Sequence, residues 1–286
     1  MNVTALLLVL GAAVVHAGWN LAAKRVADGG ARFVFLYYTV TAVLFAPIAA
    51  VSLLLTDARP QWTWLLAAAG TAVLHVAYGI VLQRGYAAGD LSVVYPLARG
   101  SGPLLSVLAA VLVLGERPGW LGLLGAFLVV AGVLVIGSGG GGGDPEQRRA
   151  GIFYGLLTGA AIAAYTLWDA HSVTDLAVPP LVYFSLGAVL QSALLAPYAL
   201  RGAGTGRLWR EHRREVLLVG VCSPVAYLLV LFAMRLAPVS LVAPARELSI
   251  VLGGLAGWLV LGEADPARRV FGSCVVLAGI AAIAVA

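Results

Sequence analysis

Residues 92–116 of the chain read SVVYPLARGSGPLLSVLAAVLVLGE, and residues 240–263 read SLVAPARELSIVLGGLAGWLVLGE. Each stretch is a long apolar run with one arginine inside it, and each ends in a Leu-Gly-Glu triplet whose glutamate follows that arginine by 17 residues. The two arginines, Arg99 and Arg246, lie 147 residues apart. This common spacing indicates that the second half of the chain repeats the first.

The composition is that of a membrane protein. Of the 286 residues, 61% are hydrophobic and only 11% are charged, whereas a soluble domain has about 45–50% apolar and about 25% charged residues. So few charges cannot coat a water-soluble surface, so we expect a multi-pass protein in a lipid bilayer. The net charge of +5 comes from basic residues in the short loops, the usual membrane pattern, and we expect no nucleic-acid partner.

A transmembrane helix needs about 20 mainly apolar residues, and the chain contains ten such segments. We therefore predict an all-α integral membrane protein with ten transmembrane helices. The predicted spans cover approximately residues 3–23, 33–55, 62–83, 91–114, 119–137, 151–172, 179–200, 215–235, 239–261 and 267–286.

The distribution of basic residues predicts the orientation of these spans. Loops on one side carry 13 of the 18 Lys and Arg residues, the opposite loops carry 3, and Arg99 and Arg246 lie within spans. Because cytoplasmic loops are enriched in Lys and Arg, we expect both termini on the extracytoplasmic side, in the plasma (inner) membrane of a prokaryote.

The duplication divides the chain into two five-helix repeats, residues 1–137 and 151–286, joined by a glycine-rich linker over residues 138–150. Five is an odd number, so the second repeat must be inverted relative to the first. Inverted repeats build secondary transporters, which bind substrate near the middle of the membrane at the repeat interface.

Further motifs make the chain resemble a known family. They are His16-Ala17-Gly18-Trp19-Asn20, Val94-Tyr95-Pro96-Leu97-Ala98-Arg99-Gly100 and Ala245-Arg246-Glu247-Leu248-Ser249, beside the duplicated Leu-Gly-Glu. With the five-plus-five layout, the chain resembles the ten-span EamA-type permeases of the drug/metabolite transporter superfamily. The resemblance implies an exporter or exchanger of small metabolites with a central cavity.

The two arginines are the leading candidates for substrate binding. A charge inside the membrane is costly unless it faces a cavity or a partner, and a guanidinium binds carboxylate or phosphate through two parallel hydrogen bonds. We predict that Arg99 and Arg246 anchor an anionic or zwitterionic substrate. The alternative is a structural salt bridge, Arg246 with Glu247 or Arg99 with a distant acid.

Two carboxylates within the spans, Glu247 and Asp169, are candidates for coupling or gating. Glu247 either binds and releases a proton during transport, which would make the proton the coupling ion, or serves as a fixed counter-ion beside Arg246. Asp169 is either a gate or coupling acid, or an interfacial charge near the end of the sixth span.

Other polar and aromatic residues are predicted to line the cavity. They can hydrogen-bond a substrate or stack against it, and ordinary packing is the alternative for each. This group contains His16, Trp19, Asn20, His75, Tyr78, Tyr95 and Tyr165.

The sequence also predicts where two spans bend. Proline removes a backbone hydrogen bond, so we expect Pro96 to interrupt the fourth span and Pro244 the ninth, which would free carbonyl groups beside the arginines. Glu116 and Glu263 lie at helix ends and are expected to close loops instead of contacting substrate.

The chain lacks the motifs HExxH, GxSxG and a phosphate-binding glycine loop, so we do not expect an enzyme. Two histidines without a third ligand predict no metal, and nothing predicts a cofactor. The predicted function is secondary transport of a small polar metabolite by alternating access, in a monomer or homodimer. A flippase for a phosphate-linked lipid headgroup is the alternative, and a membrane assembly or sensor protein is a third possibility.

Overall fold

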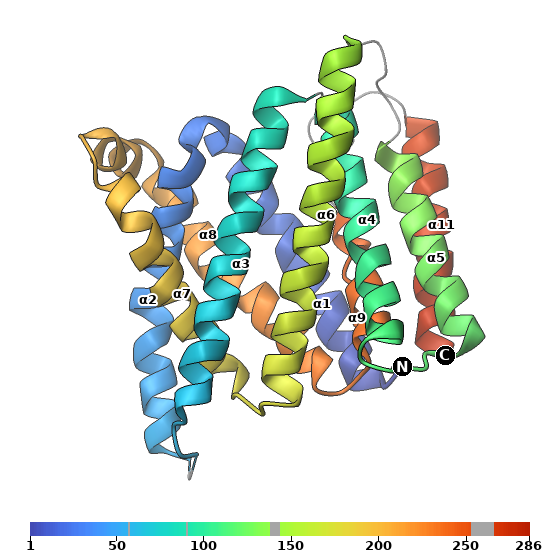
Figure 1. The fold of residues 1–286 in the computed structure, drawn as a ribbon, viewed down its shortest axis with the longest axis horizontal. Helices are drawn as coiled ribbons and strands as arrows, with labels where there is room; N and C mark the ends of the chain where they lie inside the picture. Colours follow the sequence, from blue (N-terminus) through green and yellow to red (C-terminus); the bar gives the residue numbers. More distant parts are fainter. Residues whose placement is uncertain (57, 90, 138–143, 253–265) are drawn as a thin grey trace.

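A computed structural model of the protein describes residues 1–56, 58–89, 91–137, 144–252 and 266–286, and these residues form helices without any strand. The elements are α1 (Val3–Ala23), η1 (Lys24–Gly29), α2 (Gly30–Leu54), α3 (Trp62–Ala88), α4 (Leu91–Leu112), α5 (Gly119–Gly137), α6 (Pro145–Thr174), α7 (Pro180–Ala199), α8 (Gly204–Met234), α9 (Val239–Ala245) and α11 (Pro266–Val285). Figure 1 shows them as one layered bundle of roughly aligned helices.

Eight of the described helices, α1 to α8, are long and apolar enough to cross a membrane. The prediction of an all-helical, multi-pass membrane protein is confirmed for the described residues. The count of ten is not confirmed, because the apolar part of α11, Val270–Val285, is shorter than a full span. The rest of the predicted ninth span, residues 253–261, lies outside the described residues.

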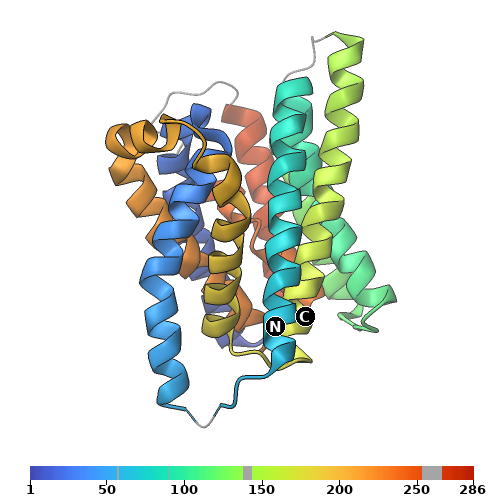
Figure 2. The same cartoon turned by 60° about the vertical axis from the view of Figure 1, so that its left-hand side comes forward.

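Both chain ends lie at the same end of the bundle (Figures 1 and 2). The amino group of Met1 donates hydrogen bonds to the carbonyl oxygens of Ile283 and Ala284, at 3.5 and 3.2 Å. We call this end of the bundle the terminal end, and the opposite end, where α5 stops and α6 begins, the linker end. Helix α1 starts at the terminal end and α6 at the linker end (Figure 1), so the first helices of the two halves run in opposite directions.

The helix contacts follow a two-fold pattern. If α1 to α5 correspond to α6, α7, α8, α9 and α11, the packing of α1 on α8 is matched by that of α6 on α3, and α2 on α8 is matched by α7 on α3. Three pairs, α2 with α7, α4 with α9 and α5 with α11, pack a helix on its own counterpart. The pattern agrees with the inverted duplication, and it brings α4 and α9 together in the middle of the bundle.

Two helix boundaries differ from those expected. Helix α6 begins at Pro145, inside the segment assigned to the linker, because Asp144 caps it by accepting a hydrogen bond from the backbone N–H of Glu146 at 3.2 Å. Helix α8 begins at Gly204 and bends at His212, whose backbone is not helical. Both helices therefore extend beyond the apolar stretch of about 20 residues by which the spans were predicted.

The prediction that Pro96 interrupts the fourth span is wrong. Helix α4 is continuous from Leu91 to Leu112 with Pro96 and Pro103 inside it. It packs along α6, where Gly155 and Gly159 allow close approach. This contact supports a continuous helix despite the two missing N–H groups.

Candidate functional site

The ninth span breaks close to the predicted position. Helix α9 ends at Ala245, Arg246 and Glu247 form a turn, and the chain becomes helical again at Leu248. Across the break the N–H of Glu247 donates to the carbonyl of Pro244 at 3.0 Å, one residue closer than in a regular α-helix. Pro244 has no N–H to continue the ladder behind it. The break thus places a cation and an anion on irregular backbone inside the bundle.

At this break, charged side chains from the two repeats form ion pairs. The guanidinium of Arg99, on α4, lies 2.9 Å from Oε2 of Glu247, and Nε of Arg246 lies 3.6 Å from Oε1 of the same carboxylate. Arg99 also donates to the hydroxyl of Ser249 at 3.3 Å. The side chain of Glu247 is 1% exposed, that of Arg99 16% and that of Arg246 11%. One buried carboxylate is therefore shared by an arginine from each repeat.

The hydrogen bonding of this ion cluster is incomplete. Among the described residues, Nε of Arg99 is buried with no hydrogen-bond partner, and Oε2 of Glu247 contacts Arg99 as an ion pair without hydrogen-bond geometry. An unmet buried donor on a charged group costs about 1–3 kcal/mol or more. The cluster carries two cations against one anion, and an acceptor atom of a bound anion would complete its hydrogen bonding.

An aromatic group links the cluster to the third and sixth helices. The guanidinium of Arg246 lies over the ring of Tyr165, 5.9 Å from its centroid. The ring of His75 stacks on Tyr165 at 4.2 Å, and Tyr78 meets Tyr165 edge-on at 5.5 Å. Tyr78 also lies within electrostatic range of Arg99. Three of the predicted cavity residues are thus brought together beside the arginines.

A second buried carboxylate lies beyond this aromatic group. Asp169, on α6, is 0% exposed and accepts hydrogen bonds from the hydroxyl of Tyr183, at 2.5 Å, and from that of Tyr227. Nε2 of His75 lies 4.0 Å from its Oδ2. Asp169 therefore joins α3, α6, α7 and α8. Whether Asp169 is a gate or coupling acid, or an interfacial charge, stays a prediction.

The predicted residues of α1 divide between the site and the packing. His16 lies within electrostatic range of both Arg99 and Arg246 and meets Trp19 edge-on at 4.7 Å. Trp19 also packs against a small apolar cluster of residues from η1, α2 and α8, which agrees with the packing alternative. Asn20 follows His16 by four residues on the same helix, so the two lie on one face.

Tyr95 lies one turn before Arg99 on α4, within electrostatic range of it, and is 43% exposed. It is the most accessible of the predicted tyrosines and borders the arginine instead of lining a closed interior.

Glu116 holds the start of the broken helix. Its two carboxylate oxygens accept the backbone N–H groups of Val239 and Ser240, each at 2.9 Å. Gly115 before it has a φ of +69°, which only glycine adopts without strain. The turn that Gly115 permits carries Glu116 from the first repeat to the helix of the second, as expected of a loop-closing residue. Glu263, its counterpart, lies outside the described residues.

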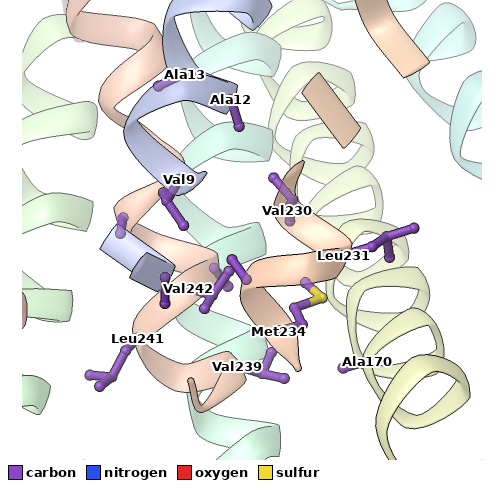
Figure 3. Close-up of a cluster of buried hydrophobic side chains, with 14 of the residues drawn as sticks. Val9, Ala12, Ala13, Ala170, Val230, Leu231, Met234, Val239, Leu241 and Val242 are labelled. Carbon is purple, nitrogen blue, oxygen red and sulfur yellow. The ribbon is translucent and has the colours of Figure 1, made fainter. Parts of the chain in front are cut away.

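An apolar cluster and a pocket lie near the terminal end of the bundle. Figure 3 shows Val9, Val230 and Val242, from α1, α8 and α9, gathered in one buried apolar cluster that also contains Met234. A pocket of about 400 Å³ opens between the ends of α4, α6 and α8 and includes Met234 in its lining. We call these four apolar residues the terminal seal; Met234 borders the pocket, and Val242 lies one helical turn before Arg246.

Sequence reasoning missed four residues of the site, namely Thr71, Tyr183, Tyr227 and Ser249. Tyrosine and threonine in apolar spans look like packing residues, since nothing local shows where their hydroxyl groups point. One signal was available: a buried Asp169 must find donors, and the tyrosines of neighbouring spans are the natural candidates. The pairing of Arg99 with Glu247 was the open salt-bridge alternative, and the structure contains it.

The described residues contain no group of three or more His, Cys, Asp and Glu side chains that could hold a metal ion. Cys222 and Cys274 are both free. The prediction that the site holds no metal or cofactor stays a prediction.

Comparison with known proteins identifies the architecture. A family model described as the EamA-like transporter family matches the chain twice, over residues 3–138 and 149–285. No curated protein matches the chain.

Among solved structures 29 chains match. One, whose title reads "Crystal structure of protein", aligns over 100% of this chain and 98% of its own with a TM-score of 0.78 and 19% sequence identity. At that identity the likeness concerns the fold alone.

Proposed function

Because the chain belongs to the EamA-like transporter family, whose members are membrane transporters of the drug/metabolite type, we propose that it is a secondary transporter of a small organic anion or zwitterion. Arg99 and Arg246 bind the anionic group of the substrate, and the two repeats alternate to open the site to either side of the membrane. The observation that supports the proposal is the convergence of one buried arginine from each repeat on a single carboxylate.

In this proposal Glu247 occupies the place of the substrate. A substrate carboxylate or phosphate has the same chemistry as the Glu247 side chain and offers acceptors for the unmet Nε of Arg99. Binding therefore exchanges one arginine partner for another instead of desolvating two bare cations, whose burial alone would cost several kcal/mol each. Tyr78, Tyr165 and His75 form the aromatic wall beside the bound anion.

The terminal seal and the outer pocket support alternating access. In this proposal the buried apolar side chains of the terminal seal are the contacts that must part when the carrier opens toward the terminal end. Transport out of a prokaryotic cell, or exchange across its inner membrane, is the direction we propose, on the family resemblance alone.

A stability panel tests the binding site. We would measure thermal unfolding of the purified protein with pyruvate, benzoate, succinate and glycerol 3-phosphate as anions, with glycine and serine as zwitterions, and with choline and ethylammonium as cations. A ligand at 100 times its Kd stabilises by about 2.7 kcal/mol. We expect stabilisation by at least one anion or zwitterion, lost in Arg99→Ala and in Arg246→Ala but kept in Arg117→Ala, a change at an exposed loop arginine.

Flux in liposomes that contain only this protein tests transport itself. We expect saturable uptake of the stabilising anion or zwitterion, and none in either arginine variant of the site. Stabilisation by choline or ethylammonium alone, or full flux in the Arg99→Ala, Arg246→Ala double variant, would overturn the anion site. Translocation of a fluorescent phospholipid in the same liposomes would support the flippase alternative, for whose phosphate group the two arginines are also suited.

A further inference from the structure

The pair formed by His75 and Asp169 is not needed to bind an anion at the arginines. Nε2 of His75 lies 4.0 Å from Oδ2 of Asp169, and the carboxylate is completely buried. Both oxygens of Asp169 already accept hydrogen bonds from tyrosine hydroxyl groups, those of Tyr183 and Tyr227. Two hydroxyl groups thus hold the carboxylate in place, and His75 is the imidazole beside it.

Thr71 satisfies His75 in either protonation state. Nδ1 of His75 lies 3.0 Å from the hydroxyl of Thr71 and 3.0 Å from the backbone carbonyl of the same residue. A neutral ring accepts from the hydroxyl and points an Nε2–H at Asp169. A protonated ring donates Nδ1–H to the carbonyl and keeps Nε2–H toward Asp169, while the freed hydroxyl turns to the oxygen of Tyr183, with which it interacts. Protonation therefore exchanges one hydrogen bond of the ring for another with the same residue.

The groups that face His75 come from every helix around it. Helix α6 contributes Tyr165 and Asp169, α7 contributes Tyr183, and α8 contributes Tyr227, whose ring meets His75 edge-on at 5.7 Å. The two arginines do not contact the His75 ring directly. Arg246 contacts Tyr165, on which His75 stacks, and Arg99 interacts electrostatically with Tyr78. The closest full charge is the carboxylate of Asp169, and a protonated His75 pairs with it.

The charge balance links this pair to the substrate site. Among the described residues of the membrane interior, the cations Arg99 and Arg246 are balanced by the anions Glu247 and Asp169. A bound monoanion adds one negative charge to this neutral set. One proton on His75 restores neutrality, and the ring lies in contact with Tyr165, the residue that Arg246 also contacts. Net charge inside the membrane is costly, so the substrate-bound carrier changes conformation at the lowest electrostatic cost when its interior charges sum to zero.

We propose that His75, paired with Asp169 and served by Thr71, is the proton-binding group of this carrier, and that one proton moves in the same direction with each monoanion. His75 takes the proton from water on the side where the anion enters and returns it to water on the other side. The inference rests on the proposed function. It assigns the coupling proton to His75 instead of to Glu247, which the substrate displaces from the arginines in the proposed function.

Liposomes with imposed gradients test the proposal, with labelled pyruvate and labelled benzoate as probes and with protein-free liposomes as the control for passive entry of the neutral acids. A pH one unit lower outside than inside should drive either probe toward about tenfold accumulation, at a saturable initial rate well above that of protein-free liposomes, because symport of one proton per anion conserves the product of their gradients. A potassium diffusion potential of either sign should leave this accumulation unchanged, and a pH dye inside the liposomes should report acidification during uptake.

Variants test whether His75 and Asp169 are responsible for the uptake driven by the pH gradient. His75→Gln and Asp169→Asn should each lose the accumulation driven by the pH gradient. His171→Gln is the matched control, since His171 is an exposed histidine beside an aspartate, 2.7 Å from Asp175, and it should accumulate both probes as the unaltered protein does. Because the gradients act on the unaltered protein as well, the test survives misfolding of any variant.

Two results would overturn the inference but leave the proposed function standing. One is saturable flux of a probe that follows the membrane potential and ignores the pH gradient. The other is alkalinisation during uptake, which indicates proton exchange instead of symport. Absence of flux for every anion and zwitterion of the stability panel would overturn the proposed function, and this inference with it.

Discussion

At the scale of single residues, the shape of the Arg99 side chain matters as much as its charge. Its guanidinium contacts Glu247 and Ser249 and has an Nε with no partner among the described residues. A lysine keeps the charge but cannot reproduce the planar fork. We predict that Arg99→Lys weakens binding of the stabilising anion about tenfold, the loss of one charge-assisted hydrogen bond of about 1.5 kcal/mol.

The measurement is the apparent Kd from thermal shifts at increasing anion concentration, with Arg117→Lys as control at an exposed site. An unchanged Kd in Arg99→Lys would show that only the charge of Arg99 matters and that the fork does not bind.

Tyr227 offers a second test at this scale. It donates one of the two hydrogen bonds that Asp169 receives from tyrosines, and Tyr227→Phe removes the hydroxyl with little change of shape. We expect a loss of about 1.5–3 kcal/mol in the free energy of unfolding, as for a hydrogen bond to a charged group. Tyr198→Phe, at an exposed tyrosine, should change it much less, and equal losses in the two variants would contradict the role of Asp169 as a held anion.

Site residues could be predicted from the sequence where the two repeats share a motif. Arg99 and Arg246 stand out because a charge in an apolar run is rare and because the run occurs twice. The partners of Asp169 could not be read off, since Tyr183 and Tyr227 follow it by 14 and 58 residues. Which hydroxyl meets which carboxylate depends on how helices pack, and no local pattern contains that information.

At the scale of helices, the cap on α9 positions half of the arginine pair. Glu116 accepts the N–H groups of Val239 and Ser240, and Arg246 follows directly after the seven residues of this helix. We predict that Glu116→Ala lowers the free energy of unfolding by about 1–2 kcal/mol, the range of a lost N-terminal cap. Anion affinity should fall as well, because the turn at Arg246 loses its support.

Thermal unfolding with and without the stabilising anion measures both effects. Glu146→Ala is the control, because Glu146 lies in the exposed first turn of α6 and Asp144 caps that helix instead. A Glu116→Ala protein as stable as the control would contradict the capping role.

The two prolines show what can be predicted for a helix from its sequence. Pro244 is followed by a break and Pro96 is not, although both replace an N–H inside an apolar span. The difference lies in the neighbours: α4 packs along α6 for much of its length. Helix position follows from apolar length and could be predicted, but helix continuity is decided by tertiary contacts.

At the scale of the whole molecule, the position of the termini connects the fold with its orientation in the membrane. Both chain ends lie at the terminal end of the bundle, near the terminal seal. The loops at the linker end carry most of the basic residues, which predicts that the linker end is cytoplasmic. We therefore predict that the terminal seal faces the exterior.

Cysteine labelling in intact cells tests this orientation. In a Cys222→Ala, Cys274→Ala background, Gln61→Cys adds a thiol at an exposed position of the terminal end, and Glu211→Cys adds one at an exposed position of the linker end. We predict that a membrane-impermeant maleimide labels the first in intact cells and the second only after lysis. The reverse pattern would put the terminal seal on the cytoplasmic side. Because the basic loops lie at the opposite end of the bundle from the termini, this one experiment decides which compartment the terminal seal faces and whether the basic loops are cytoplasmic.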